Sequence, residues 1–177
     1  TLDTLRADRL GPWDGPEGLS PRIDGIAAKG TVFGHAVAPT GTTYPTHASI
    51  LTGLYPRIHG VRSNRHTLPD ALPTVAERLT DVGYETGAFV SFRQMLYRGH
   101  LDQGFESVSD TAHQKDQTLF RDGAETTAMA IEWLAGLGAD PAFLWMHLYD
   151  PHGPYRLNDW SRERLGDYDG MLKDGAT

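Results

Sequence analysis

The run from Ala142 to Tyr149, "AFLWMHLY", is apolar at nearly every position, and a loop with two prolines and a glycine follows it. A strand with one face in water alternates apolar and polar residues, whereas a strand covered on both faces is apolar throughout. Covering both faces takes helices on either side of a mostly parallel sheet. This run therefore favours an α/β architecture.

The rest of the chain alternates in the same sense. The N-terminal residues resemble the end of a strand, and Gly or Pro residues end most periodic segments. Residues 93–118 lack periodicity and are predicted to be mostly loop. The order favours an α/β sandwich with a mostly parallel central sheet and helices on both faces. Helices are predicted at 20–30, from Thr43 or Thr46 to 55, at 72–83 and at 122–138, and strands at 31–38, 84–91 and 142–149. Their predicted apolar faces are Ile23, Ile26 and Ala27; Val75, Leu79 and Val82; and Ala124, Ala128, Ile131, Leu134 and Ala135.

Composition excludes several classes of function. The 177 residues are enough for one domain, and a net charge of −7 with no basic run argues against a nucleic-acid surface. With no cysteine, the chain has no disulfide and no thiol chemistry. No apolar run reaches the roughly 20 residues of a membrane span. The chain lacks an initiator Met, so we expect an internal fragment whose compartment, periplasmic, extracellular or cytoplasmic, and whose oligomeric state are open.

Three polar clusters follow predicted strands: Asp3, the segment 42–47, and the segment 150–152. Ligands of open α/β sheets bind at the carboxyl ends of the strands. We therefore expect these three clusters to meet at one edge of the sheet.

The segment "GTTYPTHASILTGLYPRIHGV" places Thr43 and Thr46 where a helix begins. A helix start presents unpaired N–H groups and the positive end of the dipole, which suits an anion. A hydroxyl there can attack a phosphorus or sulfur centre if a metal or base lowers its pKa. The alternative is that both threonines are only helix caps. His47, in the first turn, is expected to be a neutral imidazole.

Asp3 can bind a divalent cation, or it can be an ordinary loop aspartate. His152 lies in the loop after the last strand, where it can donate to an anionic substrate or protonate a leaving group, or have no role. His147 lies inside the apolar strand, and we interpret it as a core residue with its hydrogen bonds satisfied.

Four blocks, "DTLRADRLG", "SPRIDGIAAKG", "TTYPTHASILTGLYPRIHGV" and "FLWMHLYDPHGPY", resemble the N-terminal part of sulfatases, in the alkaline-phosphatase superfamily. The resemblance covers Thr1 to about Tyr155. It implies an alkaline-phosphatase-like fold in which 1–177 is the N-terminal part of a single catalytic domain, lacking its first strand and C-terminal portion. The family's second pair of metal ligands would lie beyond this chain.

The resemblance also implies roles for individual residues. Asp3 matches the metal-binding aspartate, and Thr43 matches the nucleophile, which is also a metal ligand. His47 matches the arginine that closes the family's signature, and it would help to stabilise the anion. His152 matches the histidine that contacts the sulfate or phosphate group. Arg93 falls near the family's G-K-W-H block and is expected to bind substrate.

The implied cofactor is a divalent metal ion: calcium, or zinc or manganese. No formylglycine is expected, because this residue is matured from Cys or Ser and the chain has Thr43 there. The implied substrate is a small-molecule or glycan sulfate or phosphate ester, hydrolysed through a covalent intermediate on Thr43. Phosphodiester or phosphonate monoester hydrolysis is the alternative within the superfamily, and a non-catalytic sulfatase-like module is the alternative outside catalysis. Ser91 stands where the family has a lysine.

Overall fold

A computed structural model describes residues 1–92, 94–109 and 120–153. Its centre is a parallel sheet of three strands in the order β2-β1-β3. A parallel bridge between Leu2 and Leu148 adds the N-terminal segment beside the end of β3. The predicted parallel sheet is therefore confirmed. The strands are β1 (Glu85–Val90), β2 (Ser107–Val108) and β3 (Ala142–His147).

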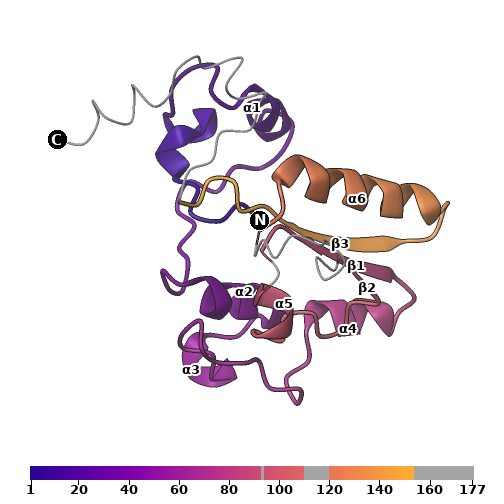
Figure 1. Cartoon of the computed structure of the whole chain (residues 1–177). Coiled ribbons are helices and arrows are strands. Elements are labelled where there is room, and N and C mark those ends of the chain that lie inside the picture. The colour runs from indigo at the N-terminus through magenta and orange to yellow at the C-terminus, as the bar shows by residue number, and fades with distance from the viewer. Residues whose placement is uncertain (93, 110–119, 154–177) are drawn as a thin grey trace.

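Helices cover both faces of this sheet, as the continuous apolar strands predict. Figure 1 shows α6 along one face, and α4, α2 and α5 on the other. The smaller helices α1 and α3 lie away from the sheet, and two short 3₁₀ turns, Ala7–Arg9 and Gly11–Trp13, precede α1. The helices are α1 (Pro21–Ala27), α2 (Thr43–Thr52), α3 (Pro56–His59), α4 (Val75–Thr80), α5 (Gln94–Tyr97) and α6 (Gly123–Gly136).

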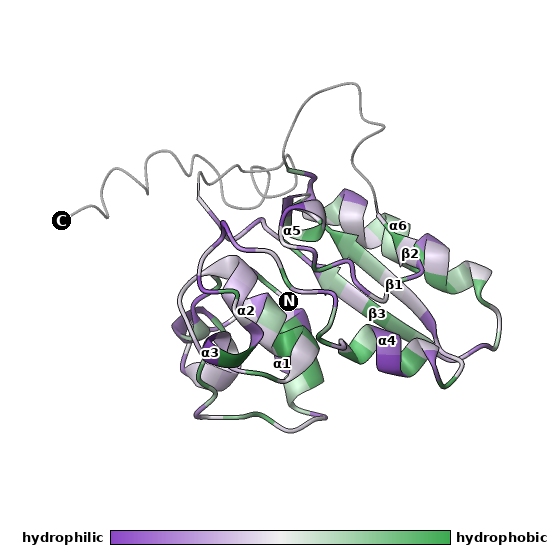
Figure 2. Ribbon diagram, turned by 90° about the horizontal axis from the view of Figure 1, so that it is seen from below, coloured by the Kyte–Doolittle hydropathy of each residue, from purple (hydrophilic) through white to green (hydrophobic). Residues whose placement is uncertain are grey.

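The core lies between the sheet and the helices α2, α4 and α5. Figure 2 shows that β1 and β3 consist largely of hydrophobic residues. Gly87 in β1 leaves room for Trp133 of α6, whose ring atoms would lie 2.9 Å from an added Cβ. Glycine in this strand thus permits the close approach of a helix. The buried core residues include Tyr44, Ala48, Leu51, Ala76, Ala88, Val90, Met95, Leu96, Leu101 and Trp145.

Three predicted elements differ from the structure. The predicted strand at 31–38 is irregular, with Phe33 and Val37 exposed, because no strand of the described residues lies beside it to pair with. The predicted loop at 93–118 contains α5 and β2, whereas residue 93 and residues 110–119 lie outside the described residues. The helix predicted at 72–83 is shorter and begins with a capping box between Thr74 and Glu77.

The predicted apolar faces of α1 and α4 are confirmed only in part, since Val75 packs against the core, and the predicted face of α6 is wrong. Ile26 of α1 is 74% exposed, and Val82, predicted to be buried, is 69% exposed. On α6, Ile131 and Leu134 are exposed, whereas the small residues Gly123, Thr126 and Ala130 are buried. Small side chains face the sheet because they let the helix approach the strands closely.

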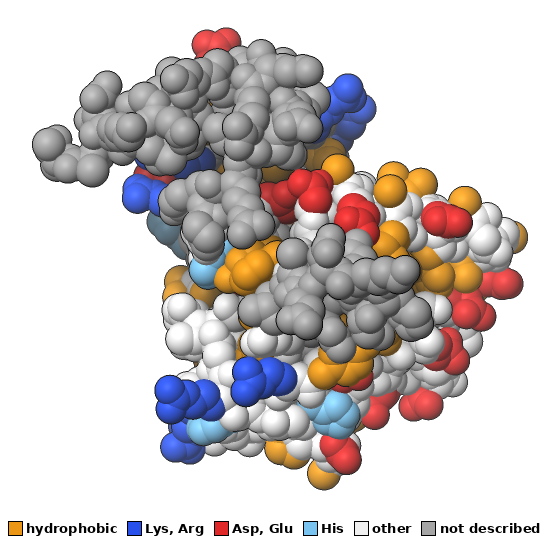
Figure 3. Space-filling view, in the orientation of Figure 1, with side chains coloured by type: hydrophobic (Ala, Val, Ile, Leu, Met, Phe, Trp, Pro, Cys, Tyr) orange, Lys and Arg blue, Asp and Glu red, His pale blue; other side chains and the backbone are white. Residues whose placement is uncertain are grey.

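Charged side chains are distributed unevenly over the surface in Figure 3. Acidic side chains gather on the half of the molecule that contains α6 and the strands, and basic ones lie near α3 and at the α1 end. Apolar side chains are scattered over the visible face. Among the described residues, no helix is both long enough and apolar enough to cross a membrane.

Candidate active site

Asp3 lies at the carboxyl end of the sheet, immediately after the bridge that joins Leu2 to Leu148. Its N–H donates to the Leu148 carbonyl at 2.9 Å, and its side chain is 10% exposed. The Thr43 hydroxyl donates to Asp3 Oδ2 at 3.4 Å. Two of the polar clusters that follow predicted strands therefore meet, although they are 40 positions apart in sequence.

Thr42, not Thr43 or Thr46, is the cap residue of α2. Its backbone is extended (φ −120°, ψ 145°), and its side chain makes no capping hydrogen bond. Thr46 Oγ1 donates instead to the Thr40 carbonyl at 2.8 Å. Thr43 is the first residue of the helix, so its hydroxyl is not used to cap α2.

The first amides of α2 are mostly occupied. The Tyr44 N–H donates to Asn64 Oδ1 at 2.8 Å, and Pro45 has no N–H. The Thr43 N–H is the one amide of this turn that no described residue accepts. The start of α2 therefore offers fewer donor groups to an anion than the sequence suggests. One N–H and one hydroxyl, both from Thr43, lie at its positive end.

His47 is buried, and both of its ring nitrogens are engaged within the protein. Nδ1 lies 2.8 Å from the Thr43 carbonyl, and Nε2 lies 3.3 Å from Thr1 Oγ1. Burial lowers the pKa of His47, and the Thr43 carbonyl and the charge of Asp3 oppose this shift only in part. His47 is thus a neutral imidazole that holds the first turn of α2.

His147 is the last residue of β3 and is fully buried. Its Nδ1 lies 2.9 Å from Thr1 Oγ1, and its ring meets the His47 ring edge-on at 4.8 Å. Its Nε2 has no hydrogen-bond partner among the described residues and lies 3.7 Å from Asp3 Oδ2. The pKa of His147 is lowered to about 3, mainly by burial and to a smaller extent by the neighbouring His47. The interpretation of His147 as a satisfied core residue is therefore wrong for one of its two nitrogens.

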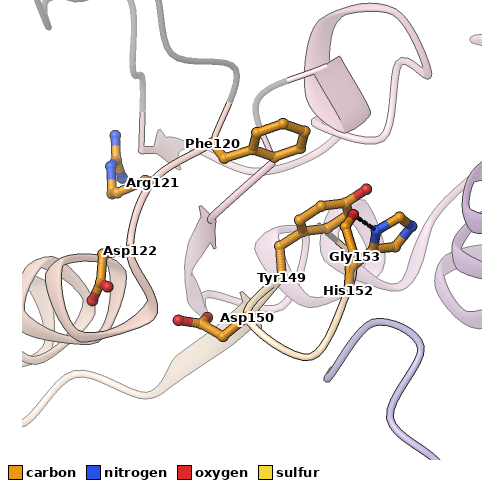
Figure 4. A pocket seen from close by; sticks show the side chains of 7 residues that line it. All are labelled: Phe120, Arg121, Asp122, Tyr149, Asp150, His152 and Gly153. Carbon is orange, nitrogen blue, oxygen red and sulfur yellow. Dashed lines mark hydrogen bonds between the residues drawn. The ribbon is translucent and has the colours of Figure 1, made fainter. Parts of the chain in front are cut away.

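His152 lies in the third cluster, at the rim of a cavity of about 240 Å³. Figure 4 shows the His152 ring lying against Tyr149, and the two stacked rings have centroids 4.2 Å apart. Phe120 stacks on the same tyrosine at 4.7 Å, so aromatic rings form one wall. The lining residues are Phe120, Arg121, Asp122, Tyr149, Asp150, His152 and Gly153.

One hydrogen bond connects this cavity to the loop that follows Asp3. The Thr4 hydroxyl donates to the Pro151 carbonyl at 3.1 Å, which ties the loop after Asp3 to the loop of His152. Burial and the negative charge of Asp3 both raise the pKa of Tyr149. The third cluster therefore borders the other two at the carboxyl end of the sheet.

Neither residue of the expected G-K-W-H block adds to the described site. Ser91 is buried, and its hydroxyl lies 2.9 Å from Thr126 Oγ1 between the sheet and α6. Arg93 lies outside the described residues, so its role in binding substrate remains a prediction.

Three potential metal-binding groups lie together: the Asp3 carboxylate, the Thr43 hydroxyl and the His147 Nε2. Within the described residues, no group of three or more His, Cys, Asp or Glu side chains is placed to hold a metal ion. Sequence reasoning missed Thr1, Asn64 and His147 as parts of this site. One sequence signal could have indicated His147. It is an ionisable residue near the end of a predicted strand, just before a polar loop.

A parallel sheet covered by helices on both faces, with a threonine hydroxyl beside a carboxylate at its carboxyl end, defines an open α/β protein with a candidate nucleophile. The Sulfatase family model matches residues 1–173, and the chain belongs to this family. It is 25% identical over 158 residues to the Delta 4,5-hexuronate-2-O-sulfatase of Bacteroides thetaiotaomicron, a match that covers 85% of this chain. The chain spans 33% of the length of that relative.

Solved structures share the fold. A protein in complex with its substrate D-glucosamine-2-N,6-O-disulfate superposes with a TM-score of 0.79 at 21% identity, over 97% of this chain and 37% of that one. The phosphonate monoester hydrolase of Agrobacterium radiobacter superposes with a TM-score of 0.73 at 19% identity, over 92% of this chain and 42% of that one.

Proposed function

We propose that the protein hydrolyses sulfate esters, or closely related phosphate esters, with Thr43 as the nucleophile. The observation that carries this proposal is the position of the Thr43 hydroxyl. Thr43 is the first residue of α2, and its hydroxyl lies 3.4 Å from Asp3 Oδ2. The N–H of the same residue has no acceptor among the described residues. The positive end of a helix favours an anionic group at this place.

In the proposed reaction, Thr43 Oγ attacks the sulfur or phosphorus atom in line with the leaving oxygen. Asp3 Oδ2 is the nearest acceptor for the Thr43 proton. The ester bond to the leaving alcohol breaks, and His152 is the proposed donor of the proton that this alcohol requires. Water then attacks the sulfur or phosphorus atom and gives a proton to His152, while the bond to Thr43 Oγ breaks and Thr43 recovers its proton from Asp3. This step releases the inorganic anion and restores the Thr43 hydroxyl.

A divalent metal is expected for the family, and the donor groups at this place fit one. The Asp3 carboxylate and the Thr43 hydroxyl are oxygen ligands that divalent cations accept. When bound, the metal would lower the pKa of the hydroxyl and neutralise charge on the transferred group. The buried His147 Nε2, which has no hydrogen-bond partner among the described residues, faces the same carboxylate.

His47 is proposed to act through Thr43. Its two nitrogens bind the Thr43 carbonyl and the Thr1 hydroxyl, so no N–H is left for the anion. The imidazole therefore fixes the backbone that carries the nucleophile, and the Thr43 N–H is the group that can donate to an anionic oxygen. His47 is accordingly a positioning residue in this proposal.

The organic part of the substrate is proposed to enter the cavity beside His152. Its wall of stacked aromatic rings suits a flat or ring-shaped group, and Asp122 and Asp150 supply acceptors for hydroxyl groups. A small-molecule or glycan ester fits these features. The names of similar proteins, which include a hexuronate sulfatase and a protein solved with a sulfated glucosamine, support this class.

Hydrolysis of phosphodiesters or phosphonate monoesters is the second candidate. The specific observation in its favour is Thr43 itself, because threonine does not mature to formylglycine, and a plain hydroxyl suits phosphoryl transfer. The likeness in fold to a phosphonate monoester hydrolase is compatible with this candidate.

The test compares Thr43→Ala with Thr46→Ala in the full-length protein, using an aryl sulfate, a bis-aryl phosphate and an aryl phosphonate. Thr46 is a matched control because its hydroxyl lies in the same turn but bonds to Thr40. We expect Thr43→Ala to lower kcat/KM by about 10³-fold or more, and Thr46→Ala to lower it by less than about tenfold. Thr43→Ala activity within about threefold of wild type excludes the nucleophile. Wild-type inactivity on all three substrates favours a non-catalytic module.

A further inference from the structure

The side chain of His147 has one feature that the proposed reaction does not use. It is fully buried, yet its Nε2 has no hydrogen-bond partner among the described residues. Buried polar atoms nearly always have a partner, and an exception is commonly explained by a water or an ion. The nearest polar atom that faces Nε2 is Asp3 Oδ2, at 3.7 Å.

The hydrogen bonds around Thr1 determine which nitrogen of His147 carries the proton. The Thr43 carbonyl can only accept, so His47 Nδ1 donates to it and the neutral ring has a lone pair on Nε2. The Thr1 hydroxyl must then donate its single proton to His47 Nε2. Thr1 Oγ1 also accepts from Trp145 Nε1 at 3.2 Å, and its remaining lone pair accepts from His147 Nδ1.

This assignment leaves a lone pair on His147 Nε2. Two acceptors, the buried imidazole nitrogen and the oxygen of the partly buried Asp3 carboxylate, thus face each other at 3.7 Å. A shared proton would draw them together to about 2.7–2.9 Å, the usual length of a charge-assisted hydrogen bond. A metal ion fits the longer separation, because bonds of about 2.0–2.2 Å to nitrogen and oxygen allow two ligands to lie up to about 4.2 Å apart.

The second nitrogen of His147 supports the same conclusion. Histidines that bind metals nearly always donate their other ring N–H to a neighbouring acceptor, which fixes the tautomer and the ring orientation. His147 Nδ1 donates to Thr1 Oγ1 at 2.9 Å in this way. Thr43 Oγ1 lies 3.4 Å from the same Asp3 oxygen, a spacing that two ligands of one ion can adopt.

We propose that His147 Nε2 is a ligand of the divalent metal ion bound by Asp3 and Thr43. This rests on the proposed function for the presence of the metal, and it adds a ligand from the end of β3. An imidazole ligand favours zinc over calcium, which binds oxygen ligands.

The test uses the metal-free full-length protein, titrated with Mn²⁺ and followed by electron paramagnetic resonance. We expect His147→Gln to raise the Kd for Mn²⁺ by about tenfold or more. Selective ¹⁵N labelling of histidine should show a directly coordinated nitrogen in the wild type, with one coupling missing in His147→Gln. The matched control is His59→Gln, because His59 is also buried but its nitrogens bond to Ser49 and Val61.

An unchanged Kd together with unchanged nitrogen couplings in His147→Gln would overturn the proposal. If His147→Gln fails to fold, the wild-type spectrum still tests the proposal. A wild-type spectrum without any coupling from histidine nitrogen to bound Mn²⁺ would exclude His147 as a ligand. Asp3→Asn separates this failure from failure of the proposed function. If Mn²⁺ binding depends on Asp3 but not on His147, the proposed ligand fails and the proposed hydrolase function does not. The activity of Thr43→Ala tests the hydrolase function separately, without reference to the metal.

Discussion

The two longest helices, α2 and α6, both begin at the carboxyl end of the sheet, but their first turns differ. At α6, the Asp122 carboxylate accepts the Ala124 N–H at 2.8 Å, and the Asp150 carboxylate accepts the Gly123 N–H at 3.1 Å. At α2, no carboxylate accepts an amide of the first turn among the described residues, and Asn64 supplies a neutral acceptor.

This difference separates a structural helix start from a functional one. Both helices present a positive dipole end, which favours negative charge. At α6 the chain supplies that charge itself, so an external anion would meet two carboxylates there. At α2 the place for the negative charge is left to the substrate, beside the Thr43 hydroxyl. The predictions that follow exchange or remove these features.

The largest effect is expected when α2 receives a carboxylate of its own. Thr42→Asp places a charge at the cap position, as Asp122 does in α6. This charge would repel an anionic substrate, and we expect kcat/KM of the full-length protein to fall by about 10- to 100-fold, since each factor of ten corresponds to about 1.4 kcal/mol.

Thr42→Asn is the control for this change, because asparagine caps helices as well as aspartate but has no charge. It should keep activity within about threefold of wild type, a change of less than about 1 kcal/mol. Equal losses in Thr42→Asp and Thr42→Asn would mean that shape, not charge, matters at this position, and the comparison between the helices would fail.

At α6, removing the cap should reduce stability. Asp122→Ala removes the acceptor of the Ala124 N–H, and we expect the free energy of unfolding to fall by about 1 kcal/mol. Asp122→Asn should remain within a few tenths of a kcal/mol of wild type, because the amide oxygen also caps. Urea unfolding of the three proteins measures the difference, and an Asp122→Ala protein as stable as wild type would contradict it.

The neutral acceptor at α2 should matter less. Asn64→Ala leaves the Tyr44 N–H without its partner, but the exposed position of Asn64 lets water replace it in part. We expect a loss of about 0.5–1 kcal/mol in urea unfolding. Asn64→Asp keeps an acceptor and should restore stability, while lowering hydrolytic activity through its charge. Activity unchanged by Asn64→Asp would indicate that the anion does not bind near this turn.

The sequence predicts the scaffold of this site better than its details. The continuous apolar run 142–149 indicates a buried parallel strand, and the carboxyl ends of parallel strands bring Asp3 and Thr43 together. Periodicity could not show that α6 places Ala130, not Ile131, toward the sheet, because both helix faces carry apolar residues.

That His147 Nε2 has no hydrogen-bond partner within the described part of the chain could not be predicted from local sequence. Whether a buried imidazole is satisfied depends on what lies opposite each of its nitrogens. Here these groups are Thr1 and Asp3, which are more than 140 positions away and are brought close only by the bridge of Leu2 to Leu148. The acceptor of the Tyr44 N–H could not be predicted for the same reason, since Asn64 reaches Tyr44 across 20 positions.

The smallest expected effect is a difference in acid sensitivity between the two helices. His59 accepts the Val61 N–H on Nδ1 and lies 3.0 Å from Ser49 of α2, so it anchors this helix as a neutral ring. Burial lowers the pKa of His59 below its unfolded value of about 6.5. The unfolded state therefore binds the proton more readily, and the stability that the neutral ring supports is complete above about pH 6.5 and declines as the pH falls below it.

Hydrogen exchange, corrected for the intrinsic pH dependence of the amides, can measure this for each helix. Between about pH 7 and pH 5, protection of the α2 amides should fall more than that of the α6 amides, because α6 contains no histidine. His59→Gln should reduce the pH dependence in α2, leaving the share that comes from the buried His47, whose pKa is also lowered. Equal loss of protection in both helices would show that acid weakens the fold as a whole, and that α2 has no separate dependence on a neutral imidazole.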